Sequence, residues 1–184
     1  MENSSHFQIN DYLKPGRHAH LVGIGGVSMR PLGLVLRSMG MQISGSDMNA
    51  SVSTDELMAK GIAVSIGHRA ENIEGADCVI RTAAANNDNP EIAAARAVGI
   101  PIFERAQAWG YIMKAYRHAI CVSGTHGKTT TTSMLTQIFM EAGKDPTVMI
   151  GGSLPLLGAG HRVGQGDTII LESCEYCNSF LNFF

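Results

Sequence analysis

Ala119-Ile120-Cys121-Val122-Ser123-Gly124-Thr125-His126-Gly127-Lys128-Thr129-Thr130 is the stretch of sequence that decides the fold. It predicts a buried strand that runs through a glycine turn into a helix, and Gly-Lys-Thr at such a junction is typical of a phosphate-binding loop. The usual spacing would place the first glycine at position 122, where this chain has Val122, so the loop is a shorter variant that begins at Gly124. We expect its backbone N–H groups to hold a β-phosphate, Lys128 to neutralise β/γ oxygens and the Thr129 hydroxyl to bind Mg²⁺.

ATP is therefore the ligand that this loop predicts, with Mg²⁺ as its companion ion. The expected ATP-binding residues are Gly124, Thr125, His126, Gly127, Lys128, Thr129 and Thr130. For His126, a phosphate-facing and a solvent-facing position both remain open. The alternative that Lys128 merely begins a solvated helix leaves the glycines and threonines of the turn unexplained.

An apolar run over residues 168–171 predicts a second strand, which ends at Glu172 and is followed by Glu175. Ligands bind at the carboxyl ends of strands in open α/β sheets, and an acid there can hold Mg²⁺. Glu172 is the better placed of the two acids because it directly follows the apolar run. Cys174 and Cys177 form a C-x-x-C pair without a second ligand pair, so we interpret them as ordinary thiols and not as a zinc site.

A second glycine-rich turn lies about 100 residues upstream, in the stretch His20-Leu21-Val22-Gly23-Ile24-Gly25-Gly26-Val27-Ser28. A strand that runs into glycines and then a helix can close backbone amides on a diphosphate. The strict G-x-G-x-x-G pattern would need glycine where this chain has Ser28, and a plain tight turn stays an alternative. Asp47, at the end of the next expected strand, has the spacing of an acid that meets a ribose hydroxyl, although a helix-capping or turn role is open for it too.

Short apolar runs alternate with helical patterns along the chain, which predicts an α/β protein built on a mainly parallel sheet. We expect strands at His18–Gly23, Gln42–Ser46, Val64–Ile66, Cys78–Thr82, Pro101–Phe103, Ala119–Ser123, Thr147–Ile150 and Thr168–Glu172. We expect helices at Val27–Met39, Thr54–Lys60, Pro90–Val98, Ala106–Tyr116 and Lys128–Ala142, several of which stop at a glycine in the manner of a left-handed cap.

The two glycine turns predict two nucleotide-type units. Residues 1–105 would form a Rossmann-like unit, residues 106–117 a linker helix, and residues 118–184 the beginning of a phosphate-loop ATPase unit. Cys78 and Cys121 fall inside expected strands and are interpreted as small core hydrophobes.

Composition narrows the class of protein further. The chain has 184 residues, 45% of them apolar and 16% charged, which is far from the signature of disorder. Its 14 Lys and Arg residues against 16 Asp and Glu give a net charge of −2, so we expect no nucleic-acid partner and no membrane-surface partner. No apolar stretch approaches the ~20 residues that span a bilayer. Because no secretory signal opens the sequence, we expect a cytoplasmic protein with reduced thiols.

Four motifs taken together, in this order, resemble the Mur ligase family. They are His20-Leu21-Val22-Gly23-Ile24-Gly25-Gly26, Ser44-Gly45-Ser46-Asp47, Gly124-Thr125-His126-Gly127-Lys128-Thr129-Thr130, and Glu172-Ser173-Cys174-Glu175-Tyr176-Cys177-Asn178-Ser179-Phe180-Leu181. Gly67-His68 and Asn89-Pro90-Glu91 also resemble segments beside the family's UDP site. The resemblance runs from about Arg17 to the last residue, and it departs from the commonest pattern at Ser28, Arg30 and Pro31.

The resemblance implies a reaction and a set of site residues. ATP would phosphorylate the carboxylate of UDP-N-acetylmuramate to an acyl phosphate, which the amine of L-alanine would then attack. Lys128 and Glu172 would be catalytic, and Thr129 and Glu172 would bind the metal. The UDP-sugar would contact Gly23, Gly25, Gly26, Val27, Ser28, Asp47, His68 and Thr82. The resemblance also implies that these residues are the N-terminal part of a longer enzyme and are inactive alone; it predicts no oligomeric state.

Other functions stay open at this point. Within the family, a recycling ligase that attaches a murein tripeptide to the same UDP-sugar is the first alternative. A UDP-sugar-binding module without catalysis is another, and UDP binding without ATP hydrolysis would indicate it. A nicotinamide oxidoreductase would explain the first glycine turn but would leave the Gly-Lys-Thr loop unused.

Overall fold

The computed structural model describes residues 7–173 and contains two β-sheets in one α/β chain. The first sheet has five parallel strands in the order β3-β2-β1-β4-β5. Their bounds are β1 His18–Val22, β2 Gln42–Asp47, β3 Ala63–Ile66, β4 Cys78–Arg81 and β5 Ile102–Glu104. The strand order reverses between β1 and β4, and ligands bind at such a reversal in open parallel sheets.

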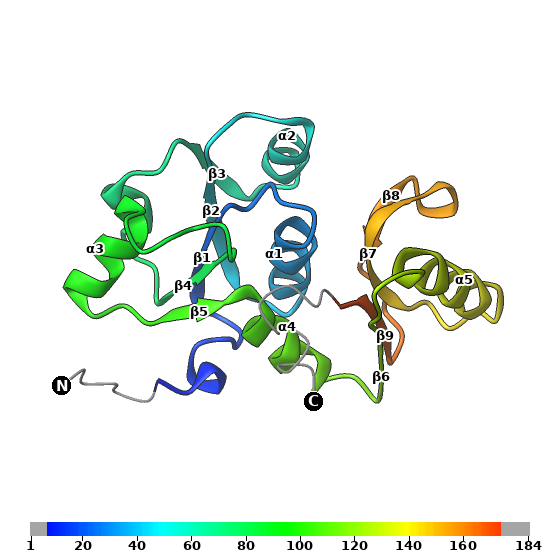
Figure 1. Cartoon of the computed structure of the whole chain (residues 1–184). Coiled ribbons are helices and arrows are strands. Elements are labelled where there is room, and N and C mark those ends of the chain that lie inside the picture. Colours follow the sequence, from blue (N-terminus) through cyan, green and yellow to red (C-terminus); the bar gives the residue numbers. More distant parts are fainter. Residues whose placement is uncertain (1–6, 174–184) are drawn as a thin grey trace.

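Helices cover both faces of the first sheet (Figure 1). Helices α1 and α2 lie on the face toward the second sheet, and α3 lies on the opposite face with the short helix η2. Helix α4 packs against α1 and against the short helix η1 near the N-terminus. Their bounds are α1 Met29–Ser38, α2 Val52–Ala59, α3 Pro90–Val98, α4 Arg105–Met113, η1 Ile9–Asp11 and η2 Ala70–Ile73.

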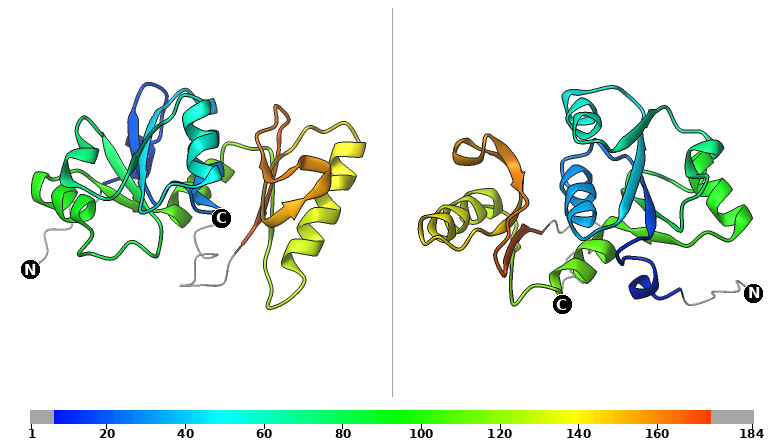
Figure 2. Two further views of the ribbon diagram at one scale, coloured as in Figure 1. Left: turned by 90° about the horizontal axis from the view of Figure 1, so that it is seen from above. Right: turned by 180° about the vertical axis from the view of Figure 1, so that it is seen from behind.

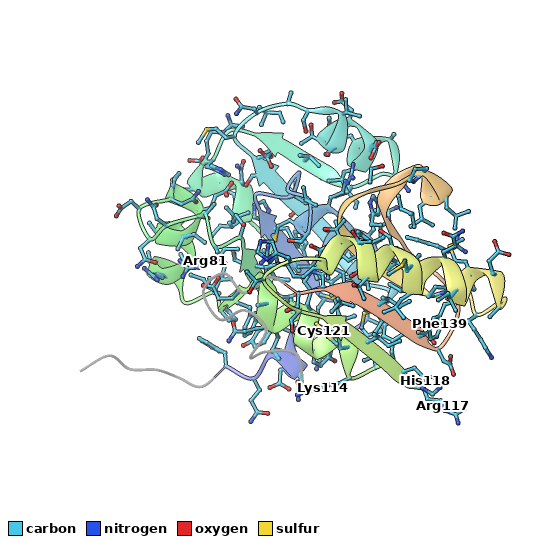
Figure 3. The ribbon with its side chains drawn as sticks, turned by 45° about the vertical axis from the view of Figure 1, so that its right-hand side comes forward. Arg81, Lys114, Arg117, His118, Cys121 and Phe139 are labelled. Carbon is cyan, nitrogen blue, oxygen red and sulfur yellow. The ribbon has the colours of Figure 1, made fainter. Side chains whose placement is uncertain are left out.

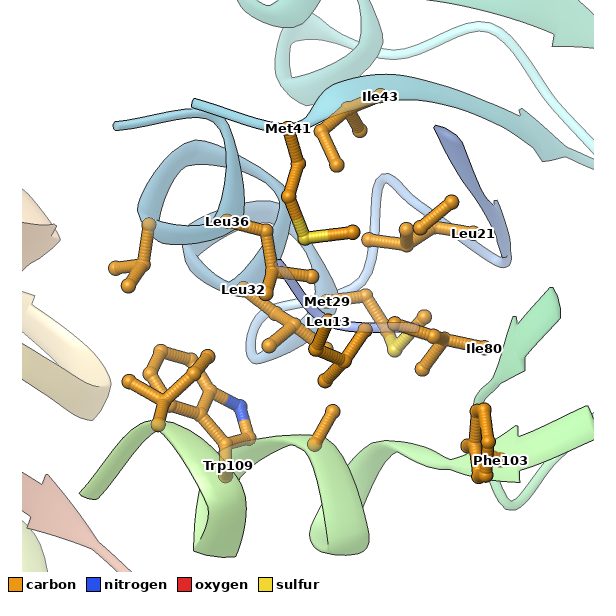
Figure 4. Packing of buried hydrophobic residues seen from close by; sticks show 14 of the residues in the cluster. Leu13, Leu21, Met29, Leu32, Leu36, Met41, Ile43, Ile80, Phe103 and Trp109 are labelled. Carbon is orange, nitrogen blue, oxygen red and sulfur yellow. The ribbon is translucent and has the colours of Figure 1, made fainter. Parts of the chain in front are cut away.

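The main hydrophobic core fills the space between α1, α4 and the first sheet (Figure 4). Trp109 of α4 is its largest side chain and is 1% exposed, against Leu32 and Leu36 of α1 in the same cluster. A smaller core on the other face joins β1 and β4 to α3 through Val22, Val79 and Ile92. The strands between the two cores are buried on both sides, as parallel strands usually are.

The second sheet has four strands in the order β6-β9-β7-β8. Strands β6, β9 and β7 are parallel, and β8 pairs antiparallel with β7 at the edge. The bounds are β6 His118–Val122, β7 Thr147–Leu154, β8 Ala159–Arg162 and β9 Thr168–Glu172, with helix α5 at Lys128–Glu141 and a short helix η3 at Pro155–Leu157. Helix α5 packs on β7 and β9.

The second sheet lies between α5 and α1 (Figure 2). Met149 of β7 and Ile169 and Leu171 of β9 are buried in the same cluster as the core of the first sheet. The covalent link is short, because α4 ends near Lys114 and β6 begins at His118 (Figure 3). The two sheets therefore share apolar contacts and a brief connection. None of the helices within residues 7–173 has the length and apolar character to cross a membrane.

The α/β fold predicted from the sequence is confirmed, and each expected strand and helix is present, most of them with ends shifted by a few residues. Gly40, Gly61, Gly99 and Gly143 all have positive φ where the preceding helices end, as expected for left-handed caps. The antiparallel strand β8 was not predicted, because Ala159-Gly160-His161-Arg162 has no apolar alternation and pairs through its backbone.

The proposed division at residues 105 and 117 stays a prediction. Cys78 is fully buried and Cys121 is half-buried, and both are free thiols. Glu175 and the Cys174/Cys177 pair lie outside the described residues.

Candidate functional site

A cavity of about 850 Å³ opens at the carboxyl ends of the first sheet's strands, next to the reversal between β1 and β4. Its size is within the usual range for small-molecule sites. Of the residues expected to contact a UDP-sugar, it brings together Gly23, Gly26, Asp47, His68 and Thr82. These residues come from four separate segments of the chain, and the fold brings them together in one cavity.

The glycine turn is packed tightly against its neighbours. Gly23 has a φ of +79°, and a Cβ placed on it would lie 2.8 Å from Cγ2 of Thr82. The N–H of Gly25 donates to the Asp47 carboxylate at 2.9 Å, and a Cβ on Gly25 would meet the same oxygen. Asp47 thus holds the turn in place while it lines the cavity, which combines the turn role and the ligand-facing position that the sequence left open.

Val27 and Ser28 lie beside this turn but are not among the residues that line the cavity. The Ser28 hydroxyl accepts a hydrogen bond from Arg105 at 2.6 Å, and its carbonyl oxygen accepts one from the Trp109 indole at 3.2 Å. The Ser28 side chain therefore ties the start of α1 to α4. A contact of Val27 or Ser28 with a sugar nucleotide stays a prediction.

A buried polar network lies under the cavity and centres on Glu91, in the first turn of α3. Its carboxylate accepts hydrogen bonds from Ser46 at 2.6 Å and Asn72 at 2.5 Å and lies 3.1 Å from Nδ1 of His68. Burial opposes ionisation of Glu91, but the neighbouring His20 and the hydrogen bonds from Ser46 and Asn72 outweigh it and lower the pKa to about 2. The cavity thus stands over an ionised, fully buried carboxylate.

The second glycine turn joins β6 to α5. Gly124 and Gly127 have φ values of +148° and +78°, and Gly127 is the residue that caps α5. Lys128 is the first residue of that helix, and its Nζ donates to the Gly124 carbonyl at 2.6 Å. Thr125, His126 and Thr130 are exposed. The turn therefore presents its backbone and the Lys128 ammonium at a helix N-terminus, where a phosphate group binds favourably.

Glu172, at the end of the neighbouring strand β9, lies next to this loop. In the parallel pair β6 and β9, Glu172 stands opposite Val122, the last residue of β6. The Thr129 hydroxyl donates to Oε1 of Glu172 at 3.0 Å. The two residues expected to bind the metal are therefore neighbours, although they lie 43 positions apart in the sequence.

Strand β7 supports Glu172 from the other side. The N–H of Gly151 donates to Oε2 of Glu172 at 2.7 Å, and a Cβ on Gly151 would lie 2.9 Å from Oε1. A Cβ on Gly152 would lie 3.2 Å from Cγ2 of Thr129. The pairing of β7 with β8 is irregular between Met149 and Leu154, which places a distortion of the strand at these glycines.

This arrangement fits Mg²⁺ bound together with nucleotide phosphates. Magnesium usually takes one or two protein oxygens and completes its shell with phosphate and water. The Thr129 hydroxyl and the Glu172 carboxylate, in contact beside the phosphate loop, can supply these one or two protein oxygens. Within residues 7–173 there is no group of three or more His, Cys, Asp or Glu side chains that could hold a metal without a ligand.

Sequence reasoning missed several residues that the structure places at these sites. Gly151 and Gly152 are part of the support for Glu172, and Arg69 lines the cavity of the first sheet. A Gly-Gly pair directly after an apolar strand was the available signal for the first two, since glycine inside a strand often marks a close approach. Arg69 carries no pattern of its own and is brought to the cavity by the loop after β3.

Comparison with known proteins places this geometry in a family. The model of the Mur ligase family, catalytic domain, matches residues 18–117, which is more than half of the chain. The chain belongs to the Mur ligase family, as its four motifs predicted.

Individual relatives are closely similar over nearly the whole chain. The UDP-N-acetylmuramate–L-alanine ligase of Clostridium botulinum (strain Hall) is 47% identical over 175 residues, which is 95% of this chain and 38% of that protein. The protein of the same name from Agathobacter rectalis is 51% identical over 174 residues, which is 94% of this chain and 38% of the relative. The chain thus spans less than half the length of these relatives.

Solved structures show the same arrangement of elements. The crystal structure of UDP-N-acetylmuramate-alanine ligase from Thermotoga maritima matches with a TM-score of 0.78 and 34% identity, over 84% of this chain and 36% of that chain. A UDP-N-acetylmuramate:L-alanyl-γ-D-glutamyl-meso-diaminopimelate ligase from Neisseria meningitides matches with a TM-score of 0.79 and 28% identity, over 87% of this chain and 53% of that chain. The fold is therefore common to both kinds of ligase.

Proposed function

We propose that this chain carries the UDP-sugar site and the ATP loop of an ATP-dependent ligase that joins L-alanine to UDP-N-acetylmuramate. The observation that carries the proposal is the contact between Thr129 of the phosphate loop and Glu172 at 3.0 Å. This contact supports a Mg–ATP site in the second sheet, and the strand ends of the first sheet form a separate cavity of the size that a nucleotide needs. The proteins named for this activity that are 47–51% identical favour L-alanine over a murein peptide as the added group.

The chemistry is activation of a carboxylate followed by amide formation. A carboxylate oxygen of the muramate attacks the γ-phosphorus of ATP, and the bond from that phosphorus to the bridging oxygen breaks to release ADP. The amine of L-alanine then attacks the carbonyl carbon of the acyl phosphate, loses a proton, and expels inorganic phosphate. Phosphoryl transfer depends mainly on positioning and on spreading of negative charge.

The residues of this chain have separate tasks in that scheme. Lys128 and the N–H groups of the loop would hold the phosphates of ATP, and Thr129 with Glu172 would hold Mg²⁺, whose charge would stabilise the phosphate oxygens. In the first sheet, the N–H of Gly25 already donates to the Asp47 carboxylate and the N–H of Gly26 to the carbonyl of Gly23. The diphosphate of the sugar nucleotide is therefore left to the backbone of Val27 and Ser28 at the start of α1 and to Arg69. We place the enzyme in the cytoplasm, where both nucleotides are available.

The substitution Lys128→Ala tests this division of tasks. We expect it to weaken Mg–ATP binding at least tenfold, because an ammonium contact with phosphate is a charge-assisted hydrogen bond. We expect the affinity for UDP-N-acetylmuramate to stay within about twofold, because that ligand binds at the other sheet. Isothermal titration with each ligand measures both effects.

Lys144→Ala is the matched control, since Lys144 is an exposed lysine beyond the end of α5. It should change neither affinity. Equal loss of both ligands in Lys128→Ala, or binding of NADH in place of the UDP-sugar by the unaltered protein, would contradict the proposal. Binding of the UDP-sugar with no binding of Mg–ATP would favour the alternative of a non-catalytic UDP-sugar-binding module.

A further inference from the structure

His68 is the one imidazole among the residues that line the cavity of the first sheet, and its side chain is 13% exposed. Its Nδ1 lies 3.1 Å from Oε2 of Glu91 and 3.0 Å from Oγ of Ser46. Which of the two ring nitrogens carries hydrogen decides what the ring can offer a ligand. The groups around Glu91 determine that choice.

Asn72 shows that Oε1 of Glu91 is an acceptor. Nδ2 of Asn72 lies 3.0 Å from the carbonyl oxygen of Gly67 and 2.5 Å from Oε1 of Glu91. A backbone carbonyl only accepts hydrogen bonds, so the atom that bridges the two must be the amide nitrogen. One of its hydrogens is directed to Gly67 and the other to Glu91.

The second carboxylate oxygen is an acceptor too. The hydroxyl of Ser46 donates to Oε2 of Glu91 at 2.6 Å, and Nε2 of the buried His20 lies 3.6 Å from Oε1. Glu91 also occupies the first turn of α3, where the helix dipole favours a negative charge. The low pKa of Glu91 agrees with this environment. At neutral pH both oxygens of Glu91 therefore carry only lone pairs.

A lone-pair oxygen 3.1 Å from Nδ1 of His68 requires a hydrogen on that nitrogen. The oxygen of Ser46 cannot supply it, because its single hydrogen already points to Glu91. In the neutral ring, Nε2 then has a lone pair and no hydrogen. Nε2 is the ring nitrogen left for the cavity.

We infer that Glu91 is a positioning residue of the nucleotide cavity, which with Ser46 holds His68 as the Nδ1–H tautomer so that Nε2 accepts a hydrogen bond from a ligand hydroxyl. Phosphate oxygens cannot donate, so the ring selects a different part of the ligand than the glycine turn does. The inference rests on the proposed function for the identity of the ligand. In a uridine diphospho-sugar, the ribose carries the hydroxyl groups of the nucleoside, and these are the donors that we assign to the acceptor nitrogen.

The tautomer can be measured without any ligand. In protein labelled with ¹⁵N-histidine, long-range nitrogen–hydrogen correlation spectra at pH 8 distinguish the two neutral tautomers and the cation, and His68→Gln assigns the signal. We expect the Nδ1–H form. A hydrogen on Nε2, in the neutral or the cationic ring, would overturn the inference whether or not the protein binds UDP.

The role of Glu91 is tested by its amide analogue. Glu91→Gln can turn its NH₂ toward Nδ1 of His68, which would then accept, and the hydrogen would move to Nε2. UDP and 2′,3′-dideoxy-UDP serve as probes in isothermal titration. We expect the unaltered protein to bind UDP about five- to tenfold more tightly than the dideoxy analogue, the worth of about one hydrogen bond. In Glu91→Gln, that ratio should fall toward one.

Glu71→Gln makes the same chemical change at an exposed acid of the neighbouring helix η2 and should keep the ratio of the unaltered protein. A purely structural role of Glu91 would weaken both probes equally and leave the ratio unchanged, which would contradict the inference. If Glu91→Gln does not fold, the tautomer in the unaltered protein and the loss of the ratio in His68→Ala still decide the matter. Failure of the unaltered protein to bind UDP would instead count against the proposed function. It would leave the tautomer undisputed, because the NMR measurement of the tautomer needs no ligand.

Discussion

Glu172 is the residue in which the sequence argument and the structure meet most closely. Its position after an apolar run predicted a strand-end acid, and the structure adds the hydroxyl of Thr129 at 3.0 Å and the N–H of Gly151 at 2.7 Å. The contact with Gly151 requires glycine at this position, because a side chain there would collide with the Glu172 carboxylate. The acid is therefore held between two strands and the phosphate loop.

Glu172→Gln should raise the Mg²⁺ concentration needed for ATP binding by about tenfold, because a neutral amide replaces an anionic oxygen ligand of similar shape. Titration of nucleotide binding at several Mg²⁺ concentrations measures the shift. Asp167→Asn, at an exposed acid just before β9, is the control and should leave the requirement unchanged. An unchanged Mg²⁺ requirement in Glu172→Gln would make Glu172 a structural acid that only orients Thr129 and β7.

At the scale of single elements, the first residues of α3 both stabilise the helix and form part of the cavity wall. Asn89 caps the helix, with its side-chain oxygen accepting from the N–H groups of Glu91 and Ile92 at 2.9 and 3.3 Å. Loss of such a cap costs about 1 kcal/mol. Asn89 and Pro90 also line the cavity. The cap thus fixes both the wall of the cavity and the carboxylate below it.

Asn89→Ala should lower the free energy of unfolding by about 1 kcal/mol and weaken UDP binding several-fold, since the first turn of α3 would lose its orientation. Ser51→Ala is the matched control, because Ser51 caps α2 through the N–H of Thr54 and is not among the residues that line the cavity. It should show a similar loss of stability with unchanged UDP affinity. Urea unfolding and isothermal titration of both variants separate the two effects; equal UDP affinities in the two variants would contradict the link.

The elements that the sequence predicted share one property, which is an apolar pattern of their own. Helix α3 was predicted with its observed bounds because Asn89-Pro90 begins it and Gly99 ends it. Strand β8 and the short helices lack such signals, since β8 is placed by backbone pairing with β7, and η1 and η2 are placed by packing against α4 and α3. The site follows the same rule: Gly23 and Lys128 were visible in local motifs, whereas the contacts of Glu91 and Gly151 depend on pairing between strands and helices that no local pattern encodes.

At the scale of the whole molecule, α4 belongs in packing to the first sheet. Trp109 and Ile112 are buried in its main core, and the indole of Trp109 donates to the carbonyl of Ser28. The family match ends at residue 117, after this helix. We therefore propose that an independently folding first unit would need α4 and would end near residue 117, because a division at residue 105 would remove a core-forming helix.

The contact between the two sheets contains a histidine whose pKa is lowered by folding. His161 of β8 lies beside α1, with its Nδ1 3.5 Å from Nη2 of Arg30. Arginine can only donate, so Nδ1 must accept and carry no hydrogen. Burial is the main cause that lowers the pKa of His161, and the charges of Arg30 and Lys60 lower it further, against a smaller opposing effect of Glu56.

Because its pKa is lowered by folding, His161 binds fewer protons in the folded chain than in the unfolded chain. Stability from this contact is therefore complete above the unfolded value of about 6.5 and falls as the pH drops below it. The thermal midpoint should decrease more between pH 8 and pH 5.5 in the unaltered protein than in His161→Gln, whose side-chain oxygen accepts from Arg30 at either pH. A loss of 1 kcal/mol shifts the midpoint of a chain of this size by about 2–4 °C, which calorimetry resolves. An identical decrease in His161→Gln would show that protonation of His161 does not weaken the contact between the sheets.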